Sequence, residues 1–199
     1  AALVQACEAS GVTLAVMLQH RLRAAALGLK ALMDAGELGA LVSASASIRW
    51  WRPQSYYDEP GRGTLARDGG GVLITQAIHT LDLLLSLTGL PERITGLAAT
   101  SPVHRMEGED TAAYPGFAER IELNGTLGSA TLEAGELRVL FADGTTRTLG
   151  TPEASGGGAN PMAFDHAAHR AVLQDFIRAV QQGIAPAVSG RSALGVQQV

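Results

Sequence analysis

The sequence predicts an α+β fold, with helices on one face of a largely antiparallel open sheet, and two observations support this. In the first half of the chain, apolar residues recur at helical spacing along 22–33 and 71–87. In the second half, short alternating segments carry hairpin signals at Asn124–Gly125 and Asp143–Gly144. Long periodic segments beside short alternating ones are typical of helices packed against an antiparallel sheet.

The start of the chain has a different pattern from the rest. Residues 1–10 predict the end of a helix that stops at Gly11, because glycine readily takes the left-handed conformation that closes a helix. The apolar, partly β-branched run 12–18 predicts a buried strand of a parallel sheet. Such a strand does not fit the antiparallel sheet downstream, so we expect it to belong to a different unit.

Several elements are predicted in the middle of the chain. A helix ends at Gly36, and residues 41–50 alternate small apolar and small polar side chains, which predicts a half-buried strand. A long loop, 51–68, follows, and loops of this length are often functional. Gly69–Gly71 then opens the helix that runs to about residue 87, and 94–99 predicts a further strand.

The end of the chain combines strands, a flexible tract and a helix. Alternating strands are predicted from Phe117 onward, and the glycine-rich tract 155–161 predicts a flexible connection. A last helix is expected from Asp165, an acceptable N-cap, to Gln182.

The composition excludes several classes of protein. With 15 Lys and Arg against 19 Asp and Glu, and no basic run, we expect no nucleic acid partner. No apolar stretch approaches the roughly 20 residues that span a bilayer, so we expect no membrane partner, and the start shows no signal-peptide pattern. The single cysteine, Cys7, can form neither an internal disulfide nor a thiolate cage, so a cytoplasmic location is expected.

The most informative polar residues lie on the predicted helix 71–87. Thr75, His79 and Asp82 are spaced i, i+4 and i+7 and share one helix face, with Gln76 beside them. His79 could act as a general acid or base, with Asp82 fixing its tautomer. Gln76 or Thr75 could contact a substrate hydroxyl. The alternative is a core histidine that a neighbouring acid satisfies on an otherwise apolar helix.

Two further segments are candidates for contact with a ligand. The loop from Trp50 to Tyr57, together with Arg62, combines aromatic rings and arginines, which suits a polar ring such as a sugar. The alternative for this loop is packing on the domain beneath it, or a subunit interface. Gln19-His20-Arg21 follows the predicted strand 12–18, at the end where open α/β sheets bind ligands, although an ordinary strand exit has the same pattern.

Two weaker patterns concern ions. Gly69–Gly71 predicts a weak anion site, because it exposes amides at the N-terminus of a helix. His166 and His169 are spaced i, i+3 but lack further ligands, so we predict no metal site. The sequence contains no G-x-G-x-x-G, P-loop or G-x-S-x-G motif.

Taken together, an ordered set of motifs resembles the Gfo/Idh/MocA family, the glucose–fructose oxidoreductase and inositol dehydrogenase-like enzymes. The motifs cover nearly the whole chain. They are Val12 to Arg21, Gly36-Glu-Leu-Gly39, Arg52 to Tyr57, Arg62-Gly-Thr64, Asp68-Gly-Gly-Gly71, Gln76-Ala-Ile-His79-Thr-Leu-Asp82, Glu107-Gly-Glu-Asp110-Thr111, Asn124-Gly-Thr-Leu-Gly128, His169 and Asp175-Phe176.

The resemblance implies a two-domain enzyme that oxidises or reduces sugars or cyclitols with NAD or NADP. An N-terminal Rossmann domain, whose glycine fingerprint and catalytic lysine would precede Ala1, binds the dinucleotide in such enzymes. Residues 1–20 would be the tail of that domain, and 21–199 the substrate-binding and oligomerisation domain. We expect Gln19 to contact the cofactor, and the uncovered sheet face to form a homodimer or homotetramer.

The resemblance also assigns roles at the site. His79 takes the position of the catalytic histidine that helps to move the hydroxyl proton. Many members have an aspartate where this chain has Thr75, and a hydroxyl cannot replace a carboxylate as a base, so Thr75 would position a substrate or a water. The residues expected on the substrate side are Arg21, Tyr57, Arg62, Gln76 and Asp82.

The sequence departs from the family at one junction. Members usually have a pair of strands between the equivalents of Ala113 and Tyr114, which are joined directly here. Because losing two strands from a sheet would expose its edges, we expect an omitted stretch near 113–114.

Two functions follow from these observations. The first is the C-terminal substrate and oligomerisation domain of an NAD(P)-dependent oxidoreductase acting on a sugar-like hydroxyl or ketone. The alternative is a non-catalytic carbohydrate-binding or dimerisation module. For the chain alone the alternative is physically simpler, because its fold lacks the half that would hold a hydride carrier. For the parent protein we favour the oxidoreductase.

Overall fold

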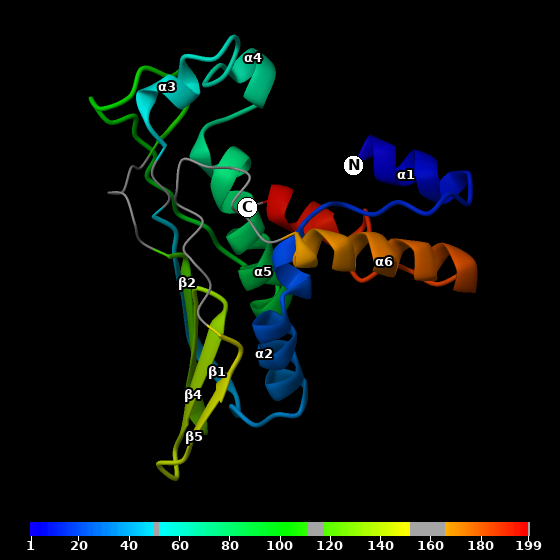
Figure 1. Cartoon of the computed structure of the whole chain (residues 1–199), viewed down its shortest axis with the longest axis vertical. Coiled ribbons are helices and arrows are strands. Elements are labelled where there is room, and N and C mark those ends of the chain that lie inside the picture. The colour runs from blue at the N-terminus through cyan, green and yellow to red at the C-terminus, as the bar shows by residue number, and fades with distance from the viewer. Residues whose placement is uncertain (50–51, 111–117, 152–165, 199) are drawn as a thin grey trace.

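The computed structural model describes residues 1–49, 52–110, 118–151 and 166–198. Within these residues the chain forms a five-stranded antiparallel sheet with helices packed against one face (Figure 1). The predicted fold class is therefore confirmed. Several predictions concern residues outside the described ranges: Trp50 and Trp51, the start of the strands at Phe117, the junction 113–114, the tract 155–161 and the cap Asp165.

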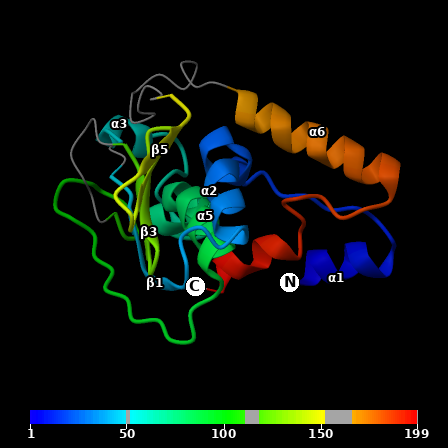
Figure 2. The same cartoon turned by 90° about the horizontal axis from the view of Figure 1, so that it is seen from below.

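The helices form two groups relative to the sheet. Helices α2 (Ala24–Asp34) and α5 (Ile78–Thr88) lie directly against it, whereas α1 (Ala2–Ala9) and α6 (Ala167–Gln182) lie beyond them (Figure 2). Four shorter helical segments connect these elements. They are η1 (Gln19–Leu22), α3 (Gln54–Tyr57), α4 (Leu65–Asp68) and η4 (Ser192–Gln197), and a π-type turn, η2 (Leu73–Ala77), leads into α5.

The strands lie in the sheet in the order in which they occur along the chain, each antiparallel to the next. Their bounds are β1 (Leu41–Ser47), β2 (Arg120–Gly125), β3 (Gly128–Glu133), β4 (Glu136–Phe141) and β5 (Thr146–Leu149). In one row across the sheet, Ala46 pairs with Ile121, Ile121 with Leu132, and Leu132 with Leu137. Because side chains alternate along a strand, this row faces the helices and the rows on either side of it face away.

The main core fills the space between this inner face and helices α2 and α5. Leu29 of α2 and Leu123 and Leu137 of the sheet are 0% exposed, and Leu83 of α5 belongs to the same cluster. Full burial of such a side chain contributes about 1.5–3 kcal/mol. The cluster fixes α5 on the sheet and so sets the direction in which the polar residues of that helix project.

Most helix ends follow the sequence prediction. Gly11, Gly36 and Gly183 all have positive φ, of 64°, 72° and 66°, and each comes shortly after the helix whose end it was expected to mark. The predicted loop 51–68 is more ordered than expected, because it contains the short helices α3 and α4.

Three strand-level predictions need correction. The run 12–18 is not a buried parallel strand: it makes one antiparallel bridge, Ala15 to Ser189, and Val12 is 59% exposed. The run 94–99 forms no strand, and Leu97 is 94% exposed. Both runs have suitable composition, but a strand also needs a neighbour to pair with along its length, and among the described residues the run 12–18 has one bridge and the run 94–99 has none.

The third correction is a hairpin turn that the sequence analysis missed. Ala134 and Gly135 connect β3 to β4, with φ of 49° and 79°. Two consecutive residues with positive φ are typical of a type I′ turn, whose twist matches that of the flanking strands. Alanine is an unusual residue at the first of these positions, so the turn carried no strong sequence signal.

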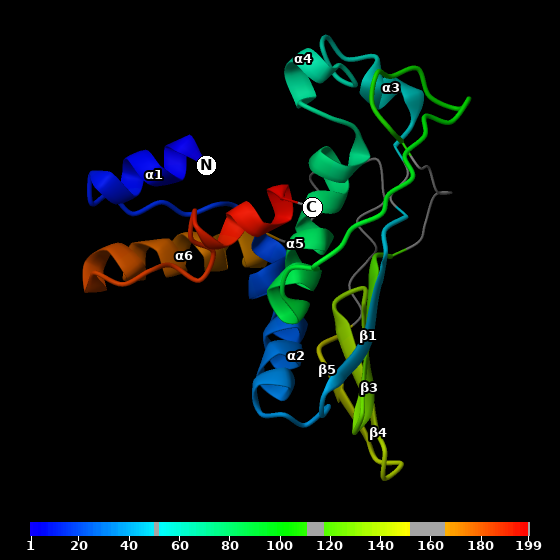
Figure 3. The ribbon, with the colours of Figure 1, turned by 180° about the vertical axis from the view of Figure 1, so that it is seen from behind.

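The segment after α5 runs back past the sheet and lies against the glycine triplet (Figure 3). The carbonyl oxygen of Glu109 accepts from the amide of Val72 (2.9 Å), and its carboxylate accepts from the amide of Leu73 (3.0 Å). The predicted anion site at this helix N-terminus is therefore wrong, because Glu109 already occupies those amides. A Cβ on Gly71 would overlap the Glu109 carbonyl oxygen, which explains the glycine there.

One helical stretch, Leu65–Thr88, is long and apolar enough to cross a membrane by length and composition alone. The sequence prediction that no stretch approaches that length is corrected accordingly. In this fold the stretch includes α5, which packs on the sheet and buries Thr80, Asp82 and Leu83. A core helix passes the same test, so the stretch is weak evidence for a membrane.

The contact at Gly71 gives a first testable prediction. Gly71→Ala should lower the free energy of unfolding by about 1–3 kcal/mol, because the added methyl group must push Glu109 away from the helix entry. Gly96→Ala is the matched control, since a Cβ there meets nothing within 4 Å. Urea unfolding followed by circular dichroism measures both, and equal stability of the two variants would contradict the prediction.

Candidate functional site

His79 lies in the first turn of α5, beside a second histidine. The ring centroids of His79 and His20 are 5.3 Å apart, with 42° between the ring planes. The Nδ1 atom of His79 is buried and has no hydrogen-bond partner among the described residues. Burial lowers the pKa of His79, while the charges of Glu119 and Asp82 act in the opposite direction. His79 is therefore neutral near pH 7 and able to accept a proton.

His20 is a buried, neutral histidine whose ring packs against that of His79. It is 1% exposed, and burial, with smaller contributions from the charges of Arg23, His79 and His169, lowers its pKa to about 2. Its Nδ1 atom lies 3.5 Å from a carboxylate oxygen of Glu119. This contact favours the tautomer with a hydrogen on Nδ1.

Glu119 is a site residue that the sequence analysis missed. Its carboxylate accepts hydrogen bonds from the hydroxyl of Thr80 (2.6 Å) and from the guanidinium of Arg23. Arg23 comes directly before α2, Thr80 lies in α5 and Glu119 directly precedes β2, so three elements meet at this carboxylate. Thr80 and Arg23 lie 39 and 96 positions before Glu119 in the sequence. Separations of this size follow no helix or strand period, so the spacing of residues did not indicate Glu119 as a site residue.

Asp82 is held by Arg21 and not by His79. Asp82 is 0% exposed, and its two oxygens accept from Nε and Nη2 of Arg21 at 2.6 and 2.5 Å. Burial raises the pKa of the Asp82 carboxyl, and the bonds from Arg21 oppose that rise. The prediction that Asp82 fixes the tautomer of His79 is thus not supported, because both carboxylate oxygens are engaged elsewhere.

The other residues predicted on this helix face have distinct surroundings. The hydroxyl of Thr75 is exposed and donates to the carbonyl oxygen of Gly71 (2.8 Å), within its own helix. Gln76 is 6% exposed, and its amide donates to the hydroxyl of Tyr57 (3.0 Å). Gln19 is buried in η1, and its Oε1 atom has no hydrogen-bond partner among the described residues.

Tyr57 belongs to a buried polar network rather than to an open sugar platform. It is 7% exposed, burial raises its pKa, and its ring packs edge-on against His104, with centroids 5.1 Å apart. Arg62 lies outside this network, with its guanidinium 4.2 Å from the centroid of Tyr56. Tyr57 therefore packs on the domain beneath the aromatic loop, which was the alternative to contact with a sugar.

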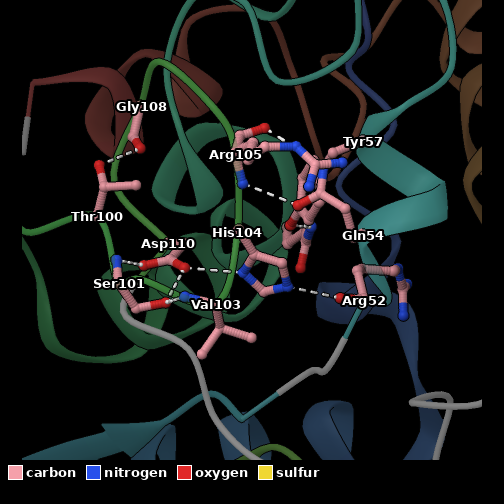
Figure 4. A network of polar contacts seen from close by, with 11 residues as sticks. Arg52, Gln54, Tyr57, Thr100, Ser101, Val103, His104, Arg105, Gly108 and Asp110 are labelled. Carbon is pink, nitrogen blue, oxygen red and sulfur yellow. Dashed lines mark hydrogen bonds and ion pairs between the residues drawn. The ribbon is translucent and has the colours of Figure 1, made fainter.

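The centre of this network is an ion pair that the sequence analysis also missed (Figure 4). Nδ1 of His104 lies 2.8 Å from a carboxylate oxygen of Asp110, and Nε2 lies 2.9 Å from the carbonyl oxygen of Arg52. Both partners are acceptors, so the two contacts are satisfied together when both ring nitrogens carry hydrogen. Ser101 donates to Asp110 through its amide and its hydroxyl, at 2.6 and 2.5 Å.

A cleft of about 600 Å³ lies on another side of α5. It runs between α2, α5 and η4, and Arg21 and Asp82 form part of its wall. Neither His79 nor Gln76 lines it, so the cleft and the histidine pair are separate features. Among the described residues, no group of three His, Cys, Asp or Glu side chains could hold a metal ion.

Comparison with known proteins gives a family model that matches part of the chain. Residues 27–114 match the model of the GFO/IDH/MocA C-terminal domain. Comparison with the curated proteins gives no match. The resemblance inferred from the sequence motifs is thus confirmed by the family model.

Solved structures extend the likeness to nearly the whole chain. The WlbA dehydrogenase from Chromobacterium violaceum, in complex with NADH and UDP-GlcNAcA, is 26% identical with a TM-score of 0.75, covering 98% of this chain and 60% of that one. The Bordetella pertussis WlbA complex with the same two ligands is 24% identical with a TM-score of 0.74, and the match covers 98% of this chain and 61% of that one. Levoglucosan dehydrogenase, in complex with NADH and levoglucosan, is 19% identical with a TM-score of 0.70, and the match covers 98% of this chain and 64% of that one. The chain spans about three fifths of the length of these dehydrogenases, and it matches their C-terminal part.

The His104–Asp110 pair gives a second prediction. Burial alone would raise the pKa of Asp110, but the bonds from Ser101 and His104 lower it overall. Asp110→Asn should therefore cost about 1.5–3 kcal/mol of unfolding free energy at pH 7, because it replaces hydrogen bonds to a buried carboxylate with weaker bonds to a neutral amide. The cost should persist down to the ordinary aspartate pKa of about 3.9 and shrink as the pH falls through the lower native value.

Urea unfolding of both proteins from pH 7 to pH 3 measures this difference. Asp34→Asn is the control, since Asp34 is 61% exposed and paired only with Lys30, and should change stability by less than about 0.5 kcal/mol. A cost for Asp110→Asn that stays constant to pH 3 would contradict the assigned ion pair.

Proposed function

From the match of residues 27–114 to the model of the GFO/IDH/MocA C-terminal domain, we propose that the chain is the substrate and oligomerisation part of an NAD(P)-dependent oxidoreductase. The substrate is a hydroxyl or ketone on a sugar-like molecule. The ligands named in the WlbA and levoglucosan dehydrogenase structures, a sugar nucleotide and a sugar, support this class. The reaction is the transfer of a hydride between the substrate carbon and the cofactor, with a proton moving on the substrate oxygen.

The observation that carries the proposal is the state of His79. The ring is neutral near pH 7, and a buried Nδ1 atom lacks a hydrogen-bond partner among the described residues. Such a group can take the proton of a substrate hydroxyl during oxidation and return it during reduction. Thr75 cannot perform this step, because its hydroxyl is not basic and already donates to Gly71.

Gln19 fits a role on the cofactor side. Its Oε1 is a buried acceptor without a partner among the described residues, and such an atom is costly unless a donor completes it. A carboxamide group, as in NAD or NADP, offers that donor. When bound, the cofactor supplies the hydride acceptor or donor. Arg21 and Asp82 act on the substrate side as a pair in this proposal, together with Gln76 and Arg62, whereas the buried Tyr57 holds the side chain of Gln76.

An apolar stripe on α6 supports a second domain packed against this chain. Three side chains of this helix, spaced i, i+4 and i+7, are each about half exposed: Leu173, Ile177 and Val180. Aligned apolar residues of this kind mark a surface that another protein surface covers. We assign the stripe to contact with the dinucleotide-binding domain.

The uncovered face of the sheet is assigned to self-association. One row across it consists of Ser45, Glu122, Thr131, Arg138 and Thr148, as the strand pairing shows. No helix covers these residues among those described, because α2 and α5 lie on the opposite face. A homodimer or homotetramer through this face would bury its hydroxyls and charges against their own copies.

Mutation of His79 separates the oxidoreductase from a non-catalytic carbohydrate-binding module. In the full-length protein, His79→Ala should lower kcat/KM at least tenfold, within the range of about 10²–10⁴ that general acid–base groups contribute. His166→Ala is the control, since His166 is an exposed histidine at the start of α6. Near-normal turnover of His79→Ala would favour the binding module.

The assembly is tested at the middle of the uncovered face. Thr131→Lys on β3 should shift the protein from dimer or tetramer towards monomer, because it places like charges opposite each other across a symmetric interface. Size-exclusion chromatography with light scattering measures the mass. Thr145→Lys, in the exposed turn before β5, is the control and should keep the native mass. An unchanged mass for Thr131→Lys would remove the sheet face as the interface.

A further inference from the structure

The carboxylate of Glu119 is placed where three elements meet around His79. It accepts from Thr80, the residue after His79, and Thr80 is 1% exposed. It is also paired with Arg23 and lies 3.5 Å from His20, whose ring packs against His79. Thr80, Arg23 and His20 thus have the Glu119 carboxylate as a common partner among the described contacts.

The position of Glu119 suits a supporting role rather than contact with substrate. Its side chain is 14% exposed, and its oxygens are already engaged by a hydroxyl and a guanidinium. Because each oxygen already accepts a hydrogen bond from a neighbouring side chain and little of the carboxylate is exposed, support of these neighbours fits Glu119 better than contact with a ligand. It can still act at a distance, because charges interact strongly in a partly buried environment.

The charges around His79 come from four elements packed on it. Arg23 and the neutral ring of His20 come from η1 and the residue that follows it, Asp82 from α5, Glu119 from the start of β2, and His169 from α6. Two of these charges, Glu119 and Asp82, favour the protonated ring, and Arg23 and His169 disfavour it. Both anions are paired with an arginine, Asp82 with Arg21 and Glu119 with Arg23, and Glu119 has the larger of the two effects that raise the pKa of His79.

We propose that Glu119 is a positioning residue for His79: it anchors Thr80, Arg23 and His20 around the histidine ring, and its charge balances the proton that the ring receives. The assignment rests on the proposed function, in which His79 exchanges a proton with the substrate. It adds a residue that the sequence motifs do not mark, and it ties the ionisation of His79 to the start of the sheet.

The first test follows the ionisation of His79 directly. The full-length protein is labelled with ¹³C in its histidine rings, His79→Gln assigns the signal, and the pH midpoint is measured in three further variants. Glu119→Gln keeps an acceptor for Thr80 but removes the charge, so the midpoint should fall by about half a pH unit or more. Arg23→Gln removes a positive charge and should raise the midpoint. Glu122→Gln removes a carboxylate from β2, the strand that follows Glu119, and should leave the midpoint unchanged because that side chain is 42% exposed and points away from the helices.

The midpoint of His79 is expected to shift in opposite directions in Glu119→Gln and Arg23→Gln, and this distinguishes a charge effect from a general loss of structure. Partial unfolding would move the midpoint in the same direction in both variants, towards that of a free histidine. Shifts of equal sign, or a Glu119→Gln midpoint equal to that of the unmodified protein, would overturn the inference. A circular dichroism spectrum for each variant confirms that the comparison is made between folded proteins.

The second test uses turnover. Glu119→Gln should lower kcat about tenfold and leave KM within about twofold, because Glu119 does not contact the substrate. It should also move the acidic limb of the kcat/KM profile to lower pH, by the same amount as the measured His79 midpoint. Unchanged kcat in Glu119→Gln, alongside an inactive His79→Ala, would overturn the inference. An active His79→Ala would instead overturn the proposed function, while the midpoints still decide whether Glu119 controls His79.

Discussion

The structure depends above all on the burial of the inner sheet face beneath α2 and α5. Leu29, Leu83 and Leu137 pack into one cluster there, and the loss of any of them would leave a cavity in the main core. The same helix, α5, supplies Leu83 to this core and His79 to the candidate site. The site therefore stands on a rigid element rather than on a loop, and the apolar packing of Leu83, one turn after His79, fixes the position of the histidine.

Buried ion pairs hold together parts of the structure that lie outside the main apolar core. Three carboxylates with little or no exposure, Asp82, Asp110 and Glu119, each face an arginine or a histidine, and the pairs of Asp82 and Glu119 join elements that are distant in the sequence. Placing a charge in such surroundings is costly unless it is paired and hydrogen-bonded. The pairs thus make the arrangement of η1, α5 and the start of β2 specific, since a shift of any one of them would separate opposite charges.

The sequence predicts those parts of the molecule that local pattern controls. The glycines at 11, 36 and 183 mark helix ends because the left-handed backbone conformation is a local requirement, and the helix that contains His79 follows from the spacing of its apolar residues. What could not be predicted depends on partners distant in the sequence. Glu119 and His104 have no periodic relation to their partners, and the run 12–18 has strand composition without a neighbouring strand. The roles of the site residues that come from family resemblance stay predictions.

The composition of the uncovered sheet face has a physical consequence for assembly. A row of hydroxyl and charged side chains, from Ser45 to Thr148, holds its hydration shell more firmly than an apolar surface does. Contacts made on such a face rely on hydrogen bonds and bridging water, and on charges that dissolved ions screen. Association through it would weaken as ionic strength rises and strengthen as protein accumulates, so the quaternary state of the protein would report the conditions of the surrounding solution.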